Sequence, residues 1–185
     1  MYSALLMLLT RRAVLFKLSN ATWCWYALAL VLIVLDQLTK FIATEQLIYA
    51  EPVWVTSFFN FTLLHNTGAA FSFLSDAGGW QRWFFGVIAA GVSVVLTVWI
   101  ARLGQAKRWE ACALALVLSG AIGNLYDRVA LGYVVDFISM HYQGHYWPAF
   151  NIADAAICIG AAMLLWDMFS GAKDDSANHD KTLEK

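Results

Sequence analysis

The stretch Trp23-Cys-Trp-Tyr-Ala-Leu-Ala-Leu-Val-Leu-Ile-Val-Leu35 decides the fold of this chain. With its flanks it covers residues 22–43, which is long enough for a helix that crosses the hydrocarbon core of a bilayer. The whole chain has a similar character, because 61% of its 185 residues are hydrophobic and only 14% are charged. A soluble domain has roughly 45–50% apolar and about 25% charged residues. The composition therefore indicates a membrane protein.

Four apolar segments predict a bundle of four transmembrane helices. They cover residues 22–43, 80–101, 110–126 and 150–169. Nine of the twelve Lys and Arg residues flank these segments on one side, and three flank them on the other. By the positive-inside rule, this asymmetry predicts that both termini are cytoplasmic and that the connections 44–79 and 127–149 face outward.

Three further parts lie outside the predicted helices. Residues 1–21 are expected to form a cytoplasmic or interfacial extension and not a cleavable signal peptide, because no basic residue precedes their apolar run. Residues 171–185 are polar and lack aromatic side chains, which predicts a disordered cytoplasmic tail. Residues 53–64 are rich in β-branched and aromatic residues and too short to span a membrane, so they predict a small sheet or hairpin at the outer surface.

Charge and cysteine usage exclude several function classes. The net charge of −1 provides no general basic field, so no nucleic-acid partner is expected. Cys24, Cys112 and Cys158 lie in apolar stretches without CxxC spacing, and we expect all three to be small buried hydrophobes. His141 and His145 are four residues apart, but they lack the Glu of the HExxH pattern. We expect neither a metal site nor a cofactor.

Two aspartates, Asp136 and Asp154, each lie inside an apolar frame, Val-Val-Asp-Phe-Ile and Ile-Ala-Asp-Ala-Ala. A carboxylate at membrane depth is costly and marks a candidate functional site. Both are predicted at the outer face, one after the third span and one at the start of the fourth. Two carboxylates that meet can share one proton and so act as acid and base. The alternative is two separate carboxylates, one that caps a helix N-terminus and one on a solvated loop.

Other polar residues are predicted near the same face. Asn151, three residues before Asp154, either holds a carboxylate or substrate backbone or caps the fourth helix. Asn66 lies in a polar turn that indicates either a backbone-binding or lid element or a simple turn. Asp127 and Arg128 are adjacent and so do not face each other on a helix. We expect Asp127 in an interfacial ion-pair network, and Arg128 could bind an anionic headgroup or peptide carbonyl groups.

Asp36 and Lys40 have the spacing of a helical ion pair near the outer end of the first span. We expect a structural pair, with the Lys40 side chain reaching outward to the interface. Gly120 and Gly123 are small residues in the third span, and we expect them to serve helix packing.

Five motifs occur together, in order, and with them the chain resembles the bacterial lipoprotein signal peptidases (signal peptidase II). They are Asp36-Gln-Leu-Thr-Lys40, His65-Asn-Thr-Gly-Ala-Ala-Phe-Ser-Phe73, Gly120-Ala-Ile-Gly-Asn-Leu-Tyr-Asp-Arg128, Val134-Val-Asp-Phe137 and Phe150-Asn-Ile-Ala-Asp154. The resemblance runs from about residue 22 to residue 169 and leaves out both ends of the chain.

The resemblance implies an α-helical, polytopic membrane protein in which residues 22–170 form a four-helix peptidase domain with a small extracytoplasmic β-cradle. It implies an aspartic endopeptidase of the bacterial inner membrane, active at the periplasmic face without metal or cofactor. Its substrates would be diacylglyceryl-modified prolipoproteins, cut just before the lipidated lipobox cysteine. Membrane lipids and globomycin-type inhibitors would be further partners.

The resemblance also assigns roles to residues. The catalytic dyad would be Asp136 and Asp154. The substrate-binding residues would be Asn66, Asn124, Arg128 and Asn151. A rival function from another class is a small proton- or ion-coupled transporter that uses the same carboxylates as a relay.

Overall fold

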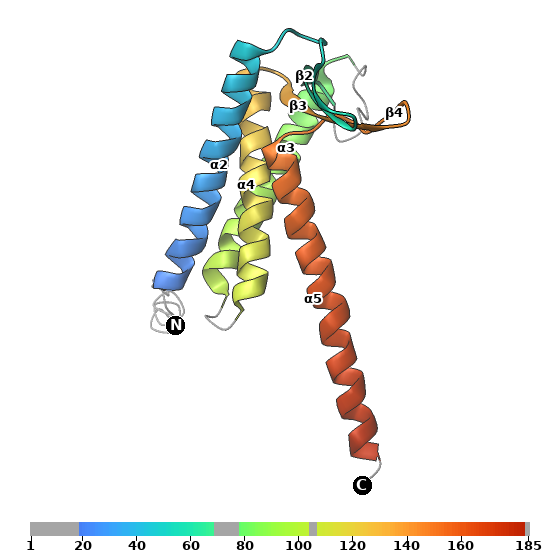
Figure 1. The fold of residues 1–185 in the computed structure, drawn as a ribbon. Helices are drawn as coiled ribbons and strands as arrows, with labels where there is room; N and C mark the ends of the chain where they lie inside the picture. Colours follow the sequence, from blue (N-terminus) through green and yellow to red (C-terminus); the bar gives the residue numbers. More distant parts are fainter. Residues whose placement is uncertain (1–18, 69–77, 104–106, 184–185) are drawn as a thin grey trace, which may run out of the picture.

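The computed structural model describes residues 19–68, 78–103 and 107–183, with side chains up to residue 170. In these residues four long helices are joined to a small sheet at one end of the bundle (Figure 1). The elements are α2 (Asn20–Gln46), β1 (Val53–Thr56), β2 (Phe59–Asn66), α3 (Trp80–Arg102), α4 (Arg108–Ala130), β3 (Val134–Tyr142), β4 (His145–Tyr146) and α5 (Ile152–Leu183). The predicted fold class, a four-helix membrane bundle with a small sheet, is confirmed.

The helix surfaces show how the bundle meets the membrane. All four helices are long and apolar enough to cross a bilayer. Large apolar side chains are exposed on their outer faces, among them Phe41 of α2, Val87 of α3 and Ile159 of α5. An apolar surface of this extent is costly in water, whereas it is favourable against lipid chains.

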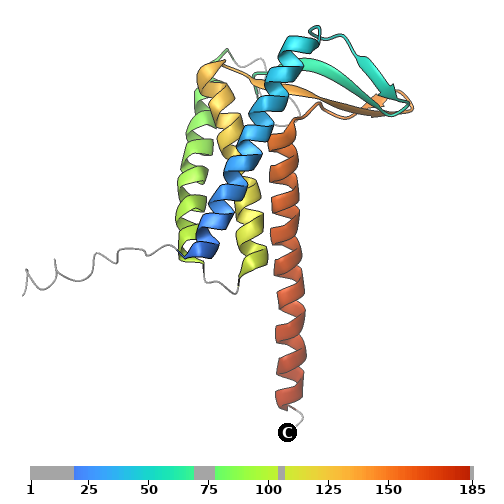
Figure 2. The same cartoon turned by 60° about the vertical axis from the view of Figure 1, so that its left-hand side comes forward.

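Helix α4 forms the centre of the bundle and is the most buried of the four spans. It contacts α2, α3 and α5 (Figure 2). At the end away from the sheet, Leu114 and Leu118 of α4 pack with Ala29 of α2 and with Leu96 and Ile100 of α3. These contacts fix α4 and give its other end a defined position beside the sheet.

The two glycines of α4 have different roles. A Cβ atom at Gly120 would lie 2.5 Å from Ile157 Cγ1, so this glycine allows the close packing of α4 on α5, as predicted. A Cβ atom at Gly123 would lie 2.7 Å from Asp36 Oδ2. Gly123 therefore makes room for a buried carboxylate of α2 as well as for helix packing.

The sheet is antiparallel, with the strand order β1-β2-β3-β4. It extends sideways from the end of the bundle (Figure 2). Strands β1 and β2 confirm the hairpin predicted for residues 53–64. Strand β3 was not predicted, although its sequence, Val-Val-Asp-Phe-Ile-Ser-Met-His-Tyr, is rich in β-branched and aromatic residues. Gly132, with φ +93°, makes the turn from α4 into β3.

Two other expectations differ from the structure. Helix α5 continues to Leu183 instead of giving way to a disordered tail at residue 171, since a helix that has already formed propagates at little cost per residue. The burial predicted for the cysteines was wrong, because Cys24 and Cys158 are exposed and Cys112 is only partly buried. An apolar stretch of a membrane helix turns much of its surface to lipid. Residues 1–18 and the part of the predicted lid after Gly68 lie outside the described residues.

Candidate active site

The start of α5 is fixed by a reciprocal cap between Asn151 and Asp154. The Asp154 backbone N–H donates to Asn151 Oδ1 at 2.9 Å, and the Asn151 backbone N–H donates to Asp154 Oδ2 at 3.3 Å. This arrangement satisfies two backbone donors that a helix N-terminus leaves without partners. The prediction that Asn151 caps the fourth helix is therefore confirmed. The cap also holds the Asp154 carboxylate at a defined position.

Asn151 also reaches the second aspartate. Its Nδ2 donates to Asp136 Oδ1 at 2.7 Å and to the Val135 carbonyl oxygen at 3.2 Å. Asp136 lies on β3 opposite Leu64 and is only 3% exposed, so it is not on a solvated loop. One fully buried side chain thus contacts both aspartates. The structure brings Asp136 and Asp154, hereafter the dyad, to the same site.

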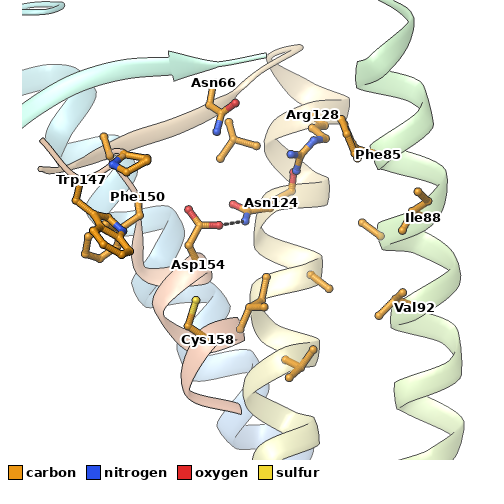
Figure 3. Close-up of a pocket in the computed structure, with 17 residues that line it drawn as sticks. Asn66, Phe85, Ile88, Val92, Asn124, Arg128, Trp147, Phe150, Asp154 and Cys158 are labelled. Atoms are coloured by element: carbon orange, nitrogen blue, oxygen red, sulfur yellow. Dashed lines mark hydrogen bonds between the residues drawn. The ribbon is translucent and has the colours of Figure 1, made fainter. Parts of the chain in front are cut away.

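Two more asparagines complete the hydrogen bonds of the dyad. Asn66 Nδ2 donates to Asp136 Oδ2 at 3.0 Å. Asn124 Nδ2, from α4, donates to Asp154 Oδ1 at 2.7 Å (Figure 3). Each carboxylate is therefore held through both of its oxygens by neutral donors, which orient it without neutralising its charge.

The environment of Asp136 shifts its protonation toward neutral pH. Burial and the negative charge of Asp154 raise the pKa of Asp136 to about 7, even though Lys40 and the hydrogen bonds from Asn66 and Asn151 favour its ionised form. A carboxyl group with such a pKa is present in both protonation states near pH 7. This is the property that general acid–base chemistry requires.

A cavity of about 480 Å³ lies beside Asp154, between α3, α4 and α5 (Figure 3). Its wall is mostly apolar and includes Ile88, Val92 and Cys158. A smaller cavity of about 200 Å³ lies beside Asp136. Asn66 lines both cavities, and each aspartate of the dyad borders one of them. The larger cavity suits an apolar ligand with a polar group near the dyad.

Arg128 lies at the edge of the larger cavity (Figure 3). Its Nη2 donates to the Gly68 carbonyl oxygen at 2.9 Å and its Nη1 to the Asn124 carbonyl oxygen at 3.1 Å. Its guanidinium carbon also lies 5.8 Å from the centre of the Phe85 ring. Arg128 therefore binds peptide carbonyl groups, here those of the chain itself, and ties the segment after β2 to α4.

A buried ion cluster adjoins these asparagines. Lys40 Nζ lies 2.8 Å from Asp36 Oδ2 and 2.9 Å from Asp127 Oδ2, and the three side chains are 1–3% exposed. We call these three residues the lysine cluster. The expectation that Lys40 reaches outward was wrong, because Asp36, Asp127 and Asn124 Oδ1, at 3.0 Å, provide an acceptor inside the protein for each of its three donors. Asp127 takes part in an ion-pair network as expected, but a buried one.

Sequence reasoning missed Gln37 as a member of this site. Its Nε2 donates to Asp127 Oδ1 at 2.9 Å and to the Gly123 carbonyl oxygen at 3.3 Å. The available signal was its position beside Asp36, because a polar amide inside an apolar span requires buried partners.

Comparison with known proteins identifies the family of this chain. A family profile described as "Signal peptidase (SPase) II" matches residues 28–170. The chain is 64% identical over 149 residues to the lipoprotein signal peptidase of Teredinibacter turnerae, covering 80% of this chain and 89% of that protein. It is 53% identical over 166 residues to the lipoprotein signal peptidase of Pseudomonas putida, covering 89% of this chain and 96% of that protein.

Two solved structures have a similar fold. The fold is similar to that of a bacterial membrane enzyme determined by the in meso method at 2.3 Å resolution, with a TM-score of 0.74 and 30% sequence identity over 82% of this chain and 90% of that one. A second such enzyme, determined at 1.9 Å resolution, gives a TM-score of 0.68 at 31% identity. With its four apolar helices and these relatives, the chain is a multi-pass bacterial membrane protein that belongs to the signal peptidase II family.

Proposed function

We propose that this protein is an aspartic endopeptidase that removes signal peptides from diacylglyceryl-modified prolipoproteins, cutting just before the lipidated lipobox cysteine. The observation that carries the proposal is the pair of buried carboxylates joined by Asn151 beside an apolar cavity. The family supports the substrate class, because the relatives are named lipoprotein signal peptidases.

The proposed reaction uses the dyad as one acid and one base. The ionised carboxylate takes a proton from a water molecule as the water oxygen attacks the scissile carbonyl carbon. The protonated carboxyl group donates its proton to the carbonyl oxygen, which gives a neutral tetrahedral intermediate. Collapse of the intermediate breaks the C–N bond, and a proton passes from the dyad to the leaving amine of the lipidated cysteine. The pair titrates as a unit, so either aspartate can start as the base.

The remaining polar residues would position the substrate. Asn66, Asn124 and Arg128 line the larger cavity together with Asp154, and Asn151 holds both carboxylates. Hydrogen bonds from such groups to the peptide backbone would set the scissile carbonyl against the dyad, and accurate positioning lowers a reaction barrier by several kcal/mol. The apolar wall of the cavity suits the acyl chains or the apolar residues of the signal peptide.

The proposed location is the bacterial inner membrane, with both termini in the cytoplasm. Asp136 lies on β3 and Asp154 in the first turn of α5. Both elements meet at the end of the bundle that carries the sheet (Figure 1), so the active site would face the periplasm. A lipid-modified substrate would then diffuse within the outer leaflet and enter between the helices, with its acyl chains remaining in an apolar environment. Residues 22–170 would be the peptidase domain.

The test is cleavage of a diacylglyceryl-modified prolipoprotein by the purified protein in detergent, with the unlipidated precursor as a matched control. We expect cleavage of the lipidated substrate alone, with the modified cysteine as the new N-terminus by mass spectrometry. Globomycin should block it. Absence of cleavage by a folded, lipid-supplemented sample would contradict the proposal. Proton flux through reconstituted vesicles would then favour the transporter.

A further inference from the structure

The lysine cluster has a feature that a simple structural ion pair does not explain. The Lys40 ammonium group has three N–H donors, and its three acceptors are Asp36, Asp127 and Asn124. The first two are carboxylates, and together they more than balance its positive charge. The third is a neutral amide, and its other end, Nδ2, donates to Asp154 at 2.7 Å.

Lys40 determines which way the Asn124 amide points. An ammonium group can only donate, so it must face the amide oxygen. The amide nitrogen is then directed to the Asp154 carboxylate. Asn151 Nδ2 also donates to Asn124 Oδ1, at 3.3 Å, and supports the same orientation. If the amide turned over, its oxygen would face a carboxylate, and the hydrogen bond to Asp154 would be replaced by repulsion.

The two carboxylates of the lysine cluster hold the chain segments that carry the dyad. Asp36 Oδ1 accepts from the backbone N–H of Ala153, at 2.8 Å. Asp127 Oδ2 accepts from the backbone N–H of Val135, at 3.1 Å. Ala153 and Val135 are the residues directly before the two dyad aspartates. Lys40 bridges Asp36 and Asp127, and so it links the start of α5 to β3.

We propose that Lys40 is a positioning residue for the dyad: by bridging Asp36 and Asp127 and orienting Asn124, it fixes the two catalytic carboxylates relative to each other. This inference rests on the proposed function. Lys40 is 3% exposed and does not line the larger cavity, so it does not act by binding substrate there. Its loss should therefore lower kcat and leave KM nearly unchanged.

The experiment removes the contacts of Lys40 while keeping the net charge of the lysine cluster at its wild-type value. Lys40→Met alone would leave two buried carboxylates without a counter-charge and would destabilise the fold. We therefore compare Asp127→Asn with Lys40→Met/Asp127→Asn. The double variant has the same cluster charge as the wild type, and an asparagine at position 127 can still accept from the Val135 N–H. Relative to Asp127→Asn, the double variant lacks one positive charge and the Lys40 contacts with Asn124 and Asp36, which are the contacts that the proposal assigns to positioning.

The expected result is a kcat about 100-fold lower in the double variant than in Asp127→Asn, with KM within about 3-fold, because a displacement of about 1 Å at a reacting group costs this much. Rates are expressed per folded molecule, with the folded fraction measured by size-exclusion chromatography and tryptophan fluorescence. Equal kcat values would overturn the proposal. A lower folded fraction with unchanged kcat would also overturn it and leave Lys40 a purely structural residue.

A second measurement does not depend on peptidase activity. Amide hydrogen exchange of Ala153 and Val135 should be at least about 10-fold faster in the double variant than in Asp127→Asn, because local openings release these amides. Unchanged exchange at both amides would contradict the proposal. If the wild type failed to cleave the lipidated substrate, the proposed function would fail, and the exchange rates would still decide the role of Lys40.

Discussion

Replacement of Asn151 by alanine should destabilise the protein more than the loss of one hydrogen bond would. The Asn151 side chain is fully buried. It caps α5 by accepting from the Asp154 backbone N–H at 2.9 Å, and it donates to Asp136 at 2.7 Å. Alanine removes both interactions and leaves a backbone donor and a carboxylate oxygen without these partners.

The size of the effect follows from these two contacts. Loss of a helix N-cap costs about 1 kcal/mol. Loss of a hydrogen bond to a carboxylate costs about 1.5–3 kcal/mol. The free energy of unfolding of Asn151→Ala should therefore fall by about 3 kcal/mol. Asn151→Ser is the matched control, because serine keeps a capping oxygen but cannot reach the carboxylate as a donor.

The assay is reversible unfolding in mixed detergent micelles, followed by tryptophan fluorescence, for wild type and both variants. We expect Asn151→Ser to lie between the other two, about 1 kcal/mol more stable than Asn151→Ala. A loss below about 1 kcal/mol for Asn151→Ala would refute this reasoning. Equal stability of the two variants would show that the cap contributes nothing.

Three further predictions concern packing, pH and metal. Gly123→Ala should lower stability and activity, because its Cβ would lie 2.7 Å from Asp36 Oδ2, whereas Gly91→Ala, whose Cβ meets nothing within 4 Å, should be neutral or slightly stabilising in the same unfolding assay. Burial and the charge of Asp154 raise the pKa of Asp136 from 3.8 to about 7, so the contribution of this group to stability is complete below about pH 4 and is lost as the pH rises through about 7. The free energy of unfolding measured from pH 4 to 8 should show this decline, and Asp136→Asn should remove it. Cleavage should continue at full rate after treatment with EDTA, because a carboxylate activates the water in the proposed reaction; loss of activity that zinc restores would contradict this.

The sequence predicted the bundle well, because the physical signal for a transmembrane helix is local. The length and hydrophobicity of a segment such as the one around residues 23–35 are enough to predict a transmembrane helix. The hairpin of residues 53–64 was predicted for a similar reason. The pattern of strand β3 was equally local, but its β-branched and aromatic residues were interpreted as the apolar frame of Asp136 and not as a strand.

The site could be predicted only in part, because its contacts join residues far apart in the chain. Lys40 and Asn124 are 84 positions apart, and Asp36 and Ala153 are 117 positions apart. Spacing on one helix identified the pair of Asp36 and Lys40, but it could not reveal that Asp127 and Asn124 complete the surroundings of the ammonium group. That information lies in the packing of α2 on α4, which Gly123 permits.

The most direct test of the central claim, that Asp136 and Asp154 act as one catalytic unit, is the single-turnover cleavage rate of a diacylglyceryl-modified prolipoprotein. The variants are Asp136→Asn, Asp154→Asn and the double variant, with Asp167→Asn, an exposed aspartate on the same helix as Asp154, as the control. We expect each dyad variant to remain folded and to lose at least about 10³-fold in rate, the double variant to be no slower than the single ones, and the control to be unaffected. Normal turnover by either single variant, or losses that multiply in the double variant, would contradict the claim.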